Sequence, residues 1–253
     1  MSPCDTANSG KIPTITVVTV VFNGRESIAK TMDSVLAQNY PCVEYIVIDG
    51  DSTDGTQDIV ERYRDKLDFL VSERDLGVYD AMNKAINLAT GEFILFMNCG
   101  DQFAGSDAVS SVMRFIEPEG DQIFFGCWSR QVDDRTLVHC RPSLEKGLFN
   151  HQAVIYSRRI HAWHGGYVNV KGLTTADYLF FATLFDSAAV SCKVVEPTIA
   201  VIDVNGLSAG TQTLSQKFAI DFICGRVGKI RLLMVLIFHP IYRLGKTLLG
   251  LKH

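Results

Sequence analysis

The sequence predicts an α/β fold in which helices flank a mostly parallel central sheet, with antiparallel strands added in the second half. Apolar, β-branched runs alternate with segments of helical periodicity up to about residue 100. Such alternation is typical of βαβ units joined by right-handed crossovers. After about Asp121 the alternation weakens and shorter β-like pieces follow one another. The two halves of the chain therefore contribute differently to one sheet.

In the first half, the expected strands are unbroken apolar runs, as in strands that helices cover on both faces. The clearest run is ITVVTVVF, which Asn23 and Gly24 interrupt. After it, apolar residues recur at helical spacing from Ile28 through Met32 to Val35. The expected strands are residues 15–22, 43–49, 67–72 and 91–97, and the best-defined helix covers residues 80–88.

The second half contains five β-like pieces and one clear helix. The helix is DYLFFATLF, which begins at Asp177. No Pro- or Ser-rich linker and no internal repeat divides the chain, so we expect a single domain over residues 12–224. The β-like pieces are QIFFGCW, TLVHC, HQAVIYS, SCKVVEP and TIAVID.

The chain ends in a basic tail, residues 225–253. Residues 222–253 contain no Asp or Glu but several Lys and Arg residues. The longest apolar run of the tail, residues 232–238, is too short to span a bilayer. As a basic amphipathic helix interrupted near Pro240, the tail would lie at an anionic membrane surface. The alternative is a C-terminal helix that packs on the core.

Composition and charge restrict the class of protein. The chain has 253 residues, a hydrophobic share of 47% and a net charge of −4. Because the tail is basic, the body is more acidic than this net charge, which disfavours binding to nucleic acid. Seven scattered cysteines without a CxxC pair argue against a disulfide framework or a zinc site. With no signal-peptide pattern at the N-terminus, we expect a cytoplasmic protein, with the tail at the cytoplasmic face of the membrane.

Polar residues cluster where three of the expected strands end. In parallel α/β sheets, ligands bind beyond the carboxyl ends of the strands, so these clusters should meet at one edge. The segment MNCGD has a single carboxylate, Asp101, directly after an apolar strand. That aspartate either belongs to a turn or helix cap or holds a cation. The clusters are Asn23-Gly24, Asp49-Gly50-Asp51 and Asn98-Cys99-Gly100-Asp101.

Four motifs in order make the sequence similar to family-2 glycosyltransferases. They are TVVTVVFNGRESIAKTMDSVLAQNYPCVEYIVIDGDSTDGT, GVYDAMNKAINLATGEFILFMNCGD, HQAVIYSRR and the AD before YLFF. The resemblance extends from about residue 12 to about residue 205 and is closest to bacterial exopolysaccharide transferases of the colanic acid cluster type. It implies the GT-A fold, with a Rossmann-like sheet, and an inverting transfer from a nucleotide-sugar, with UDP-sugars favoured, to a glycan or lipid-linked acceptor.

The resemblance implies that residues near the ends of the first strands bind the nucleotide. Asp49 and Asp51 stand where the family usually has two adjacent aspartates, and both remain candidates for contact with the base. Phe22 lies where relatives often place an aromatic ring against the base, although a strand residue also suits the core. Lys84 is the candidate for the diphosphate in place of an arginine, or is simply solvated. The implied nucleotide-binding residues are Val20, Phe22, Asn23, Asp49, Asp51 and Lys84.

A divalent metal, Mn²⁺ or Mg²⁺, is the implied cofactor. Asp101 matches the last carboxylate of the family's DxD motif, and Gly100 replaces the preceding aspartate. A metal held by one or two carboxylates and by substrate phosphates neutralises the charge of a departing diphosphate. His151 matches a histidine that relatives commonly have near the metal and the acceptor, and Gln152 is the next acceptor candidate. A lone histidine before a strand is also commonly structural.

Asp177 matches the family's catalytic carboxylate at the start of an apolar helix. Inverting transfer is one displacement in which a base removes the proton of the acceptor hydroxyl. The N-terminus of a helix favours the ionised carboxylate that a base requires. The alternative is that Asp177 only caps the helix.

Three other functions compete with this one. A non-catalytic nucleotide-sugar-binding relative of the same fold would explain the carboxylates that are missing at Gly50 and Gly100. A sugar-phosphate nucleotidyltransferase would need a glycine-rich basic loop after the first strand, and FNGRES has one glycine. A Rossmann dehydrogenase would need a GxGxxG motif after a strand, and no strand here is followed by one.

Overall fold

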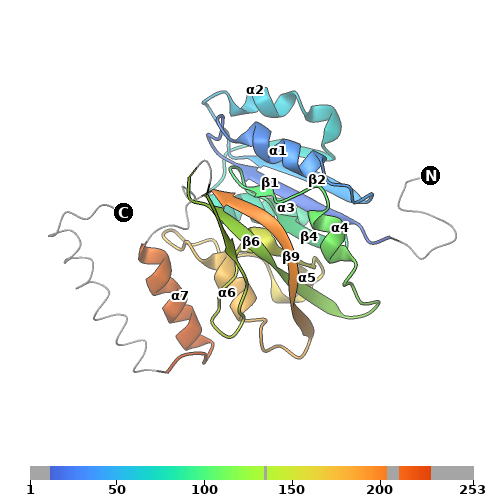
Figure 1. Cartoon of the computed structure of the whole chain (residues 1–253). Helices are drawn as coiled ribbons and strands as arrows, with labels where there is room; N and C mark the ends of the chain where they lie inside the picture. The colour runs from blue at the N-terminus through green and yellow to red at the C-terminus, as the bar shows by residue number, and fades with distance from the viewer. Residues whose placement is uncertain (1–11, 134–135, 204–210, 229–253) are drawn as a thin grey trace.

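The computed structural model describes residues 12–133, 136–203 and 211–228. The described residues form a nine-stranded sheet with the strand order β3-β2-β1-β4-β8-β6-β9-β5, and β7 pairs with β6. Helices cover both faces of this sheet (Figure 1). The α/β fold that the sequence predicts is confirmed.

The strands are β1 Ile15–Val21, β2 Val43–Asp49, β3 Phe69–Ser72, β4 Phe93–Phe96, β5 Gln102–Phe103, β6 Asp121–Gln131, β7 Leu137–Cys140, β8 Val154–Ser157 and β9 Val190–Asp203. The α-helices are α1 Ile28–Leu36, α2 Thr56–Glu61, α3 Val78–Leu88, α4 Ala108–Met113, α5 Ile160–His164, α6 Ala176–Ala182 and α7 Thr211–Ile223. Two short 3₁₀ helices are η1 Arg64–Lys66 and η2 His151–Ala153.

The first half has the expected parallel strands. β1 pairs in parallel with β2 and β4, and β2 pairs in parallel with β3. Every residue of β1 is buried, because α1, α2 and α4 pack on one face of the sheet and α3, α5 and α6 on the other. The apolar run that begins at Ile15 is therefore a central strand covered on both faces.

The second half adds antiparallel strands, with one parallel exception. β8 runs antiparallel to β4 and β6, and β5 runs antiparallel to β9. The pieces SCKVVEP and TIAVID form one long strand, β9, which pairs in parallel with β6. Because β9 runs in the same direction as β4, it ends at the same edge of the sheet. This brings Asp203 to the edge where β1, β2 and β4 end.

Other sequence predictions concern the cysteines and the tail. Cys42 is disulfide-bonded, whereas the other cysteines that the structure describes are free thiols. Among the described residues, no helix is long and apolar enough to cross a membrane. The tail segment expected at a membrane surface, residues 232–251, lies outside the described residues.

A buried carboxylate connects neighbouring segments by hydrogen bonds at the edge of the sheet opposite to the one where β1, β2 and β4 end. Glu44, near the start of β2, accepts hydrogen bonds from the Thr16 hydroxyl of β1 and from the hydroxyl and N–H of Thr90. Burial raises the pKa of the Glu44 carboxyl, but the hydrogen bonds outweigh burial and leave the pKa below its ordinary value. The ionised group therefore stabilises the fold above the ordinary pKa, and this contribution is lost as the pH falls through the folded-state pKa.

Replacement Glu44→Gln should lower the free energy of unfolding by about 1 to 3 kcal/mol at neutral pH, because the amide accepts fewer of these hydrogen bonds. The difference from wild type should shrink at an acidic pH below the folded-state pKa of Glu44, where the wild-type carboxyl is protonated as well. Urea denaturation at both pH values measures this, with the exposed Glu61→Gln on α2 as the control. An equal loss at both pH values would contradict the role assigned to the charge.

Candidate functional site

The polar clusters after β1, β2 and β4 meet at one edge of the sheet, as the sequence predicts. The Thr31 hydroxyl of α1 donates to the carbonyl oxygen of Asp101 at 2.8 Å and accepts from the N–H of Gly100 at 3.0 Å. Gly24 lies so close to Cys99 that a Cβ at Gly24 would stand 2.4 Å from the Cys99 sulfur. The loop after β1 and the segment MNCGD after β4 are therefore in contact.

Three buried polar atoms at this edge have no hydrogen-bond partner among the described residues. They are Asp49 Oδ1, Asn98 Oδ1 and His151 Nε2. His151 belongs to this edge because it precedes β8, which is antiparallel to β4, and its ring centroid lies 5.6 Å from that of Phe96. Buried polar atoms in proteins are nearly always paired. Unpaired atoms at the ligand-binding edge of an α/β sheet point to partners that a ligand supplies.

Asp49 is held rigidly at the end of β2 and is only 1% exposed. Its Oδ2 accepts hydrogen bonds from the Ser52 N–H at 3.2 Å, from Gln57 Nε2 at 3.1 Å and from the Ser72 hydroxyl at 2.6 Å. Its Oδ1 remains unpaired. Oδ2 is thus held by hydrogen bonds within the protein, and Oδ1 can accept a hydrogen bond from a bound ligand.

Asp75 stands beside the position where the family usually has a second aspartate. A Cβ at Gly50 would lie 2.5 Å from Asp75 Oδ2 and 3.4 Å from the ring of Phe22. Asp51 is exposed and adopts a left-handed conformation with φ 66. Phe22 is 65% exposed, so its ring is not part of the core. The sequence missed Asp75, because only the fold brings it to Gly50.

Val20 and Asn23 connect the strand ends. The Val20 side chain is buried in the core, and its carbonyl oxygen accepts the N–H of Cys99 at 3.1 Å. If Val20 contacts a nucleotide, it therefore does so through its backbone and not through its side chain. Asn23 Oδ1 accepts the N–H of Thr53 at 2.9 Å, and the Asn23 N–H donates to the Ser52 hydroxyl at 2.8 Å. Asn23 fixes the loop that surrounds Asp49.

The charge of Lys84 is already paired. Its Nζ lies 2.8 Å from Glu73 Oε1 and 3.7 Å from Asp80 Oδ2, and it donates to the carbonyl oxygen of Arg74 at 3.0 Å. The hydrogen bond to Glu73 raises the pKa of the lysine. Its role at a diphosphate stays a prediction.

The surroundings of Asp101 suit a divalent cation. Asp101 is 7% exposed, and its Oδ1 accepts the N–H of Asp203 at 3.0 Å. Burial, together with the nearby negative charge of Asp203, raises the pKa of the Asp101 carboxyl to about 7 despite that hydrogen bond. Two neighbouring carboxylates and the unpaired Asn98 Oδ1 are the oxygen ligands that hard cations prefer. No three His, Cys, Asp or Glu side chains of the described residues gather around one point, so phosphates and water would complete such a site.

Asp177 and His151, two residues that the resemblance assigns to the site, lie close together. Asp177 is in the first turn of α6, where its Oδ2 lies 3.9 Å from His151 Nδ1 and its Oδ1 accepts the Tyr79 hydroxyl at 2.8 Å. Burial lowers the pKa of His151, although the charge of Asp177 opposes this, so the imidazole is neutral at pH 7. The N–H of Gln152 donates to Asn150 Oδ1, which caps η2. The sequence did not predict the contact with Tyr79.

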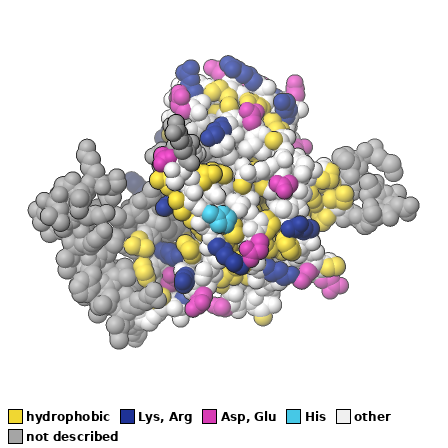
Figure 2. Space-filling view, in the orientation of Figure 1, with side chains coloured by type: hydrophobic (Ala, Val, Ile, Leu, Met, Phe, Trp, Pro, Cys, Tyr) yellow, Lys and Arg dark blue, Asp and Glu magenta, His cyan; other side chains and the backbone are white. Residues whose placement is uncertain are grey.

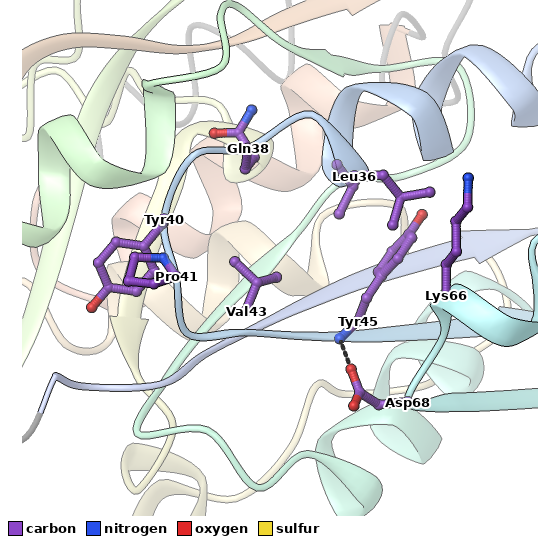
Figure 3. A pocket seen from close by; sticks show the side chains of 9 residues that line it. Leu36, Gln38, Tyr40, Pro41, Val43, Tyr45, Lys66 and Asp68 are labelled. Carbon is purple, nitrogen blue, oxygen red and sulfur yellow. Dashed lines mark hydrogen bonds between the residues drawn. The ribbon is translucent and has the colours of Figure 1, made fainter. Parts of the chain in front are cut away.

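A hollow of about 140 Å³ lies near the start of β2, away from these residues (Figure 3). Asp68 Oδ2 accepts the N–H of Tyr45 at 2.7 Å, and the Tyr45 hydroxyl pairs with the Thr19 hydroxyl at 2.9 Å. None of its described lining atoms is both buried and unpaired, unlike those around Asp49. The lining residues are Val35, Leu36, Gln38, Tyr40, Pro41, Val43, Tyr45, Lys66 and Asp68.

Charges of both signs lie on the surface of the described residues, and the expectation that the body does not bind nucleic acid stays a prediction. On the face drawn in Figure 2, Lys and Arg side chains are interspersed with Asp and Glu side chains. Binding to a nucleic-acid backbone relies on a continuous basic patch.

Known proteins resemble this chain in sequence. Residues 16–185 match the family model of glycosyl transferase family 2. A PGL/p-HBAD biosynthesis glycosyltransferase of Mycobacterium bovis (strain BCG / Pasteur 1173P2) is 29% identical over 202 residues, which cover 74% of this chain and 76% of that protein. The putative teichuronic acid biosynthesis glycosyltransferase TuaG of Bacillus subtilis (strain 168) is 30% identical over 139 residues, or 52% of this chain and 55% of that protein.

Solved structures share the fold. The structure of S. aureus TarS 1–349 in complex with UDP-GlcNAc aligns with a TM-score of 0.65 at 18% identity. The alignment covers 83% of this chain and 65% of the TarS chain. The mannosyltransferase PcManGT from Pyrobaculum calidifontis, in complex with GDP-Man and Mn²⁺, has a TM-score of 0.68 at 23% identity, covering 87% of this chain and 66% of that chain. This likeness confirms the GT-A fold. With the family match over most of its length, the chain belongs to glycosyl transferase family 2 and is a glycosyltransferase.

Proposed function

We propose that this glycosyltransferase moves a sugar from a nucleotide-sugar, with UDP-sugars favoured, to a glycan or lipid-linked acceptor during synthesis of a cell-surface polysaccharide. The observation that carries the proposal is the set of unpaired buried atoms of Asp49, Asn98 and His151 at the carboxyl edge of the sheet. The names of the relatives support a glycan product, since one is a PGL/p-HBAD biosynthesis glycosyltransferase and another a putative teichuronic acid biosynthesis glycosyltransferase. The UDP-GlcNAc complex of TarS supports a UDP-sugar.

The donor nucleotide would bind at the ends of β1 and β2. Asp49 Oδ1 is fixed in place and accepts an N–H from the base, which satisfies an oxygen that has no partner among the described residues. The exposed ring of Phe22 offers a face for stacking on the base. Asp51 and Asp75 are the carboxylates near the ribose.

Asp101 and Asn98 would hold a divalent metal beside the diphosphate. The bound metal supplies Lewis-acid neutralisation of the charge that develops on the leaving diphosphate. The complex of PcManGT with GDP-Man and Mn²⁺ supports Mn²⁺ as the ion. Asp101 is buried near a second carboxylate, so a cation there relieves a repulsion within the fold.

Addition of Mn²⁺ with UDP should raise the thermal midpoint of the wild-type protein, and EDTA should reverse the metal-dependent part. A ligand that binds only the folded state stabilises it by about 2.7 kcal/mol at a concentration 100-fold above its Kd. Asp101→Asn should lose the metal-dependent part, whereas Asp107→Asn before α4 should keep it. If UDP stabilises the protein equally with and without metal, and equally in Asp101→Asn, the segment MNCGD is only a turn and holds no metal.

Asp177 would act as the base of a single displacement. The acceptor hydroxyl oxygen attacks the anomeric carbon, its proton passes to Asp177 Oδ2, and the bond from that carbon to the diphosphate oxygen breaks. The electron pair of that bond leaves with the nucleoside diphosphate, and the configuration of the sugar inverts. His151 and Gln152 flank the acceptor side, and the neutral imidazole of His151 does not compensate the negative charge of the base.

Asp177→Asn should lower the transfer rate by about 10²- to 10⁴-fold, the usual contribution of a general base. Its Kd for the donor should stay within about twofold of the wild-type value, because the amide has almost the same shape. Asp186→Asn, an exposed change just beyond α6, is the control. The assay measures nucleoside diphosphate release with a panel of UDP-, GDP- and dTDP-sugars. Undiminished transfer by Asp177→Asn would remove the residue from the mechanism.

The tail would hold the enzyme at the cytoplasmic face of the membrane, where a lipid-linked acceptor is found. Its basic residues would be attracted to anionic lipids. Deletion of residues 229–253 leaves all the described residues in place and should abolish co-sedimentation with vesicles that contain phosphatidylserine. Binding to purely zwitterionic vesicles should be weak for both forms. Equal sedimentation of the two forms with anionic vesicles would contradict this location.

A further inference from the structure

Helix α3 presents two pairs of polar side chains on neighbouring faces. Asp80 and Lys84, one turn apart, form the face whose charges are already paired. Tyr79 and Asn83, also one turn apart, form a face that turns toward the segment leading to α6. Nothing in the donor or metal site described above requires this second pair.

Tyr79 reaches the candidate base directly. Its hydroxyl donates to Asp177 Oδ1 at 2.8 Å, although the two residues are 98 positions apart in the chain. Tyr79 is 8% exposed, and burial, followed by the charge of Asp177, raises its pKa well above the ordinary value. The phenol therefore keeps its proton at every working pH and remains a permanent donor.

Asn83 fixes the segment around the same contact. Its Oδ1 accepts the N–H of Tyr167 and its Nδ2 donates to the Tyr167 carbonyl, both at 2.8 Å. The rings of Tyr167 and Tyr79 lie 6.0 Å apart between centroids. A Cβ at Gly166 would stand 2.6 Å from Asn83 Oδ1, so glycine allows this close approach. The ring of Tyr79 is thus enclosed on the side of Tyr167.

We propose that Tyr79 is a positioning residue that holds Asp177 Oδ1 and so leaves Oδ2 to take the proton of the acceptor. This rests on the proposed role of Asp177 as the base. The His151 Nδ1 atom that faces Oδ2 is 3.9 Å away, too far for a hydrogen bond, so Oδ2 is available for the acceptor. A carboxylate fixed at one oxygen has a defined direction for the other, which is what a near-attack geometry requires.

The first test is the replacement Tyr79→Phe, which removes one hydroxyl and keeps the ring. Transfer should fall by about 10- to 100-fold, as for a small misplacement of a reacting group, while the Kd for the donor stays within about twofold. Tyr178→Phe is the matched control. Tyr178 follows Asp177 in the chain, and its hydroxyl also donates to a buried carboxylate, that of Asp221. The control should retain the transfer rate. Equal losses in both variants would mean a general loss of packing and would overturn the proposal.

The second test does not need activity. In protein with ¹³C-labelled aspartate carboxyls, the Asp177 resonance is identified by its absence in Asp177→Asn. Tyr79→Phe should shift this resonance, and Tyr178→Phe should leave it in place. A resonance that Tyr79→Phe does not move would overturn the positioning role whatever the enzyme transfers. If the resonance moves but Asp177→Asn transfers sugar normally, the proposed base is wrong and the positioning role in catalysis falls with it.

Discussion

The parallel pairing of β1 with β2 and β4 is the constraint on which the site depends. It brings together strand ends that are distant in sequence, so that Asp49, Asn98 and Asp101 all lie at one edge of the sheet. The same direction is repeated in β6 and β9, which extends that edge and places Asp203 beside Asp101. An antiparallel partner at any of these positions would move a carboxylate to the opposite edge, where Glu44 only fastens the sheet.

In the proposed function, the second half of the chain would contribute the acceptor side of the site. His151 precedes β8, and Asp177 lies in the first turn of α6, whose Phe180 and Phe181 share one core cluster with α3 and the central strands. The hydrogen bond of Tyr79 connects this half to the first half of the chain at Asp177, the proposed base. In the proposed function, the relative position of donor and acceptor would therefore depend on core packing and on one buried polar contact, rather than on the loops alone.

The sequence predicted what local patterns encode. β1, β2 and β4 follow from unbroken apolar runs, and the convergence of Asp49 and Asp101 follows from parallel βαβ units. It did not predict that β9 pairs in parallel with β6, because the residues of a strand do not specify the direction of its partner. Contacts over long separations, such as Asp75 against Gly50 and Tyr79 against Asp177, depend on how helices pack on the sheet and leave no periodic signal.

The central claim is that the unpaired atoms at the carboxyl edge bind a nucleotide. A crystal structure of the chain with UDP and Mn²⁺ tests this most directly. The base should donate an N–H to Asp49 Oδ1, and the metal should contact Asp101 together with the diphosphate. A nucleotide bound elsewhere, for example in the hollow lined by Tyr45 and Lys66, with Asp49 Oδ1 still unpaired, would contradict the account.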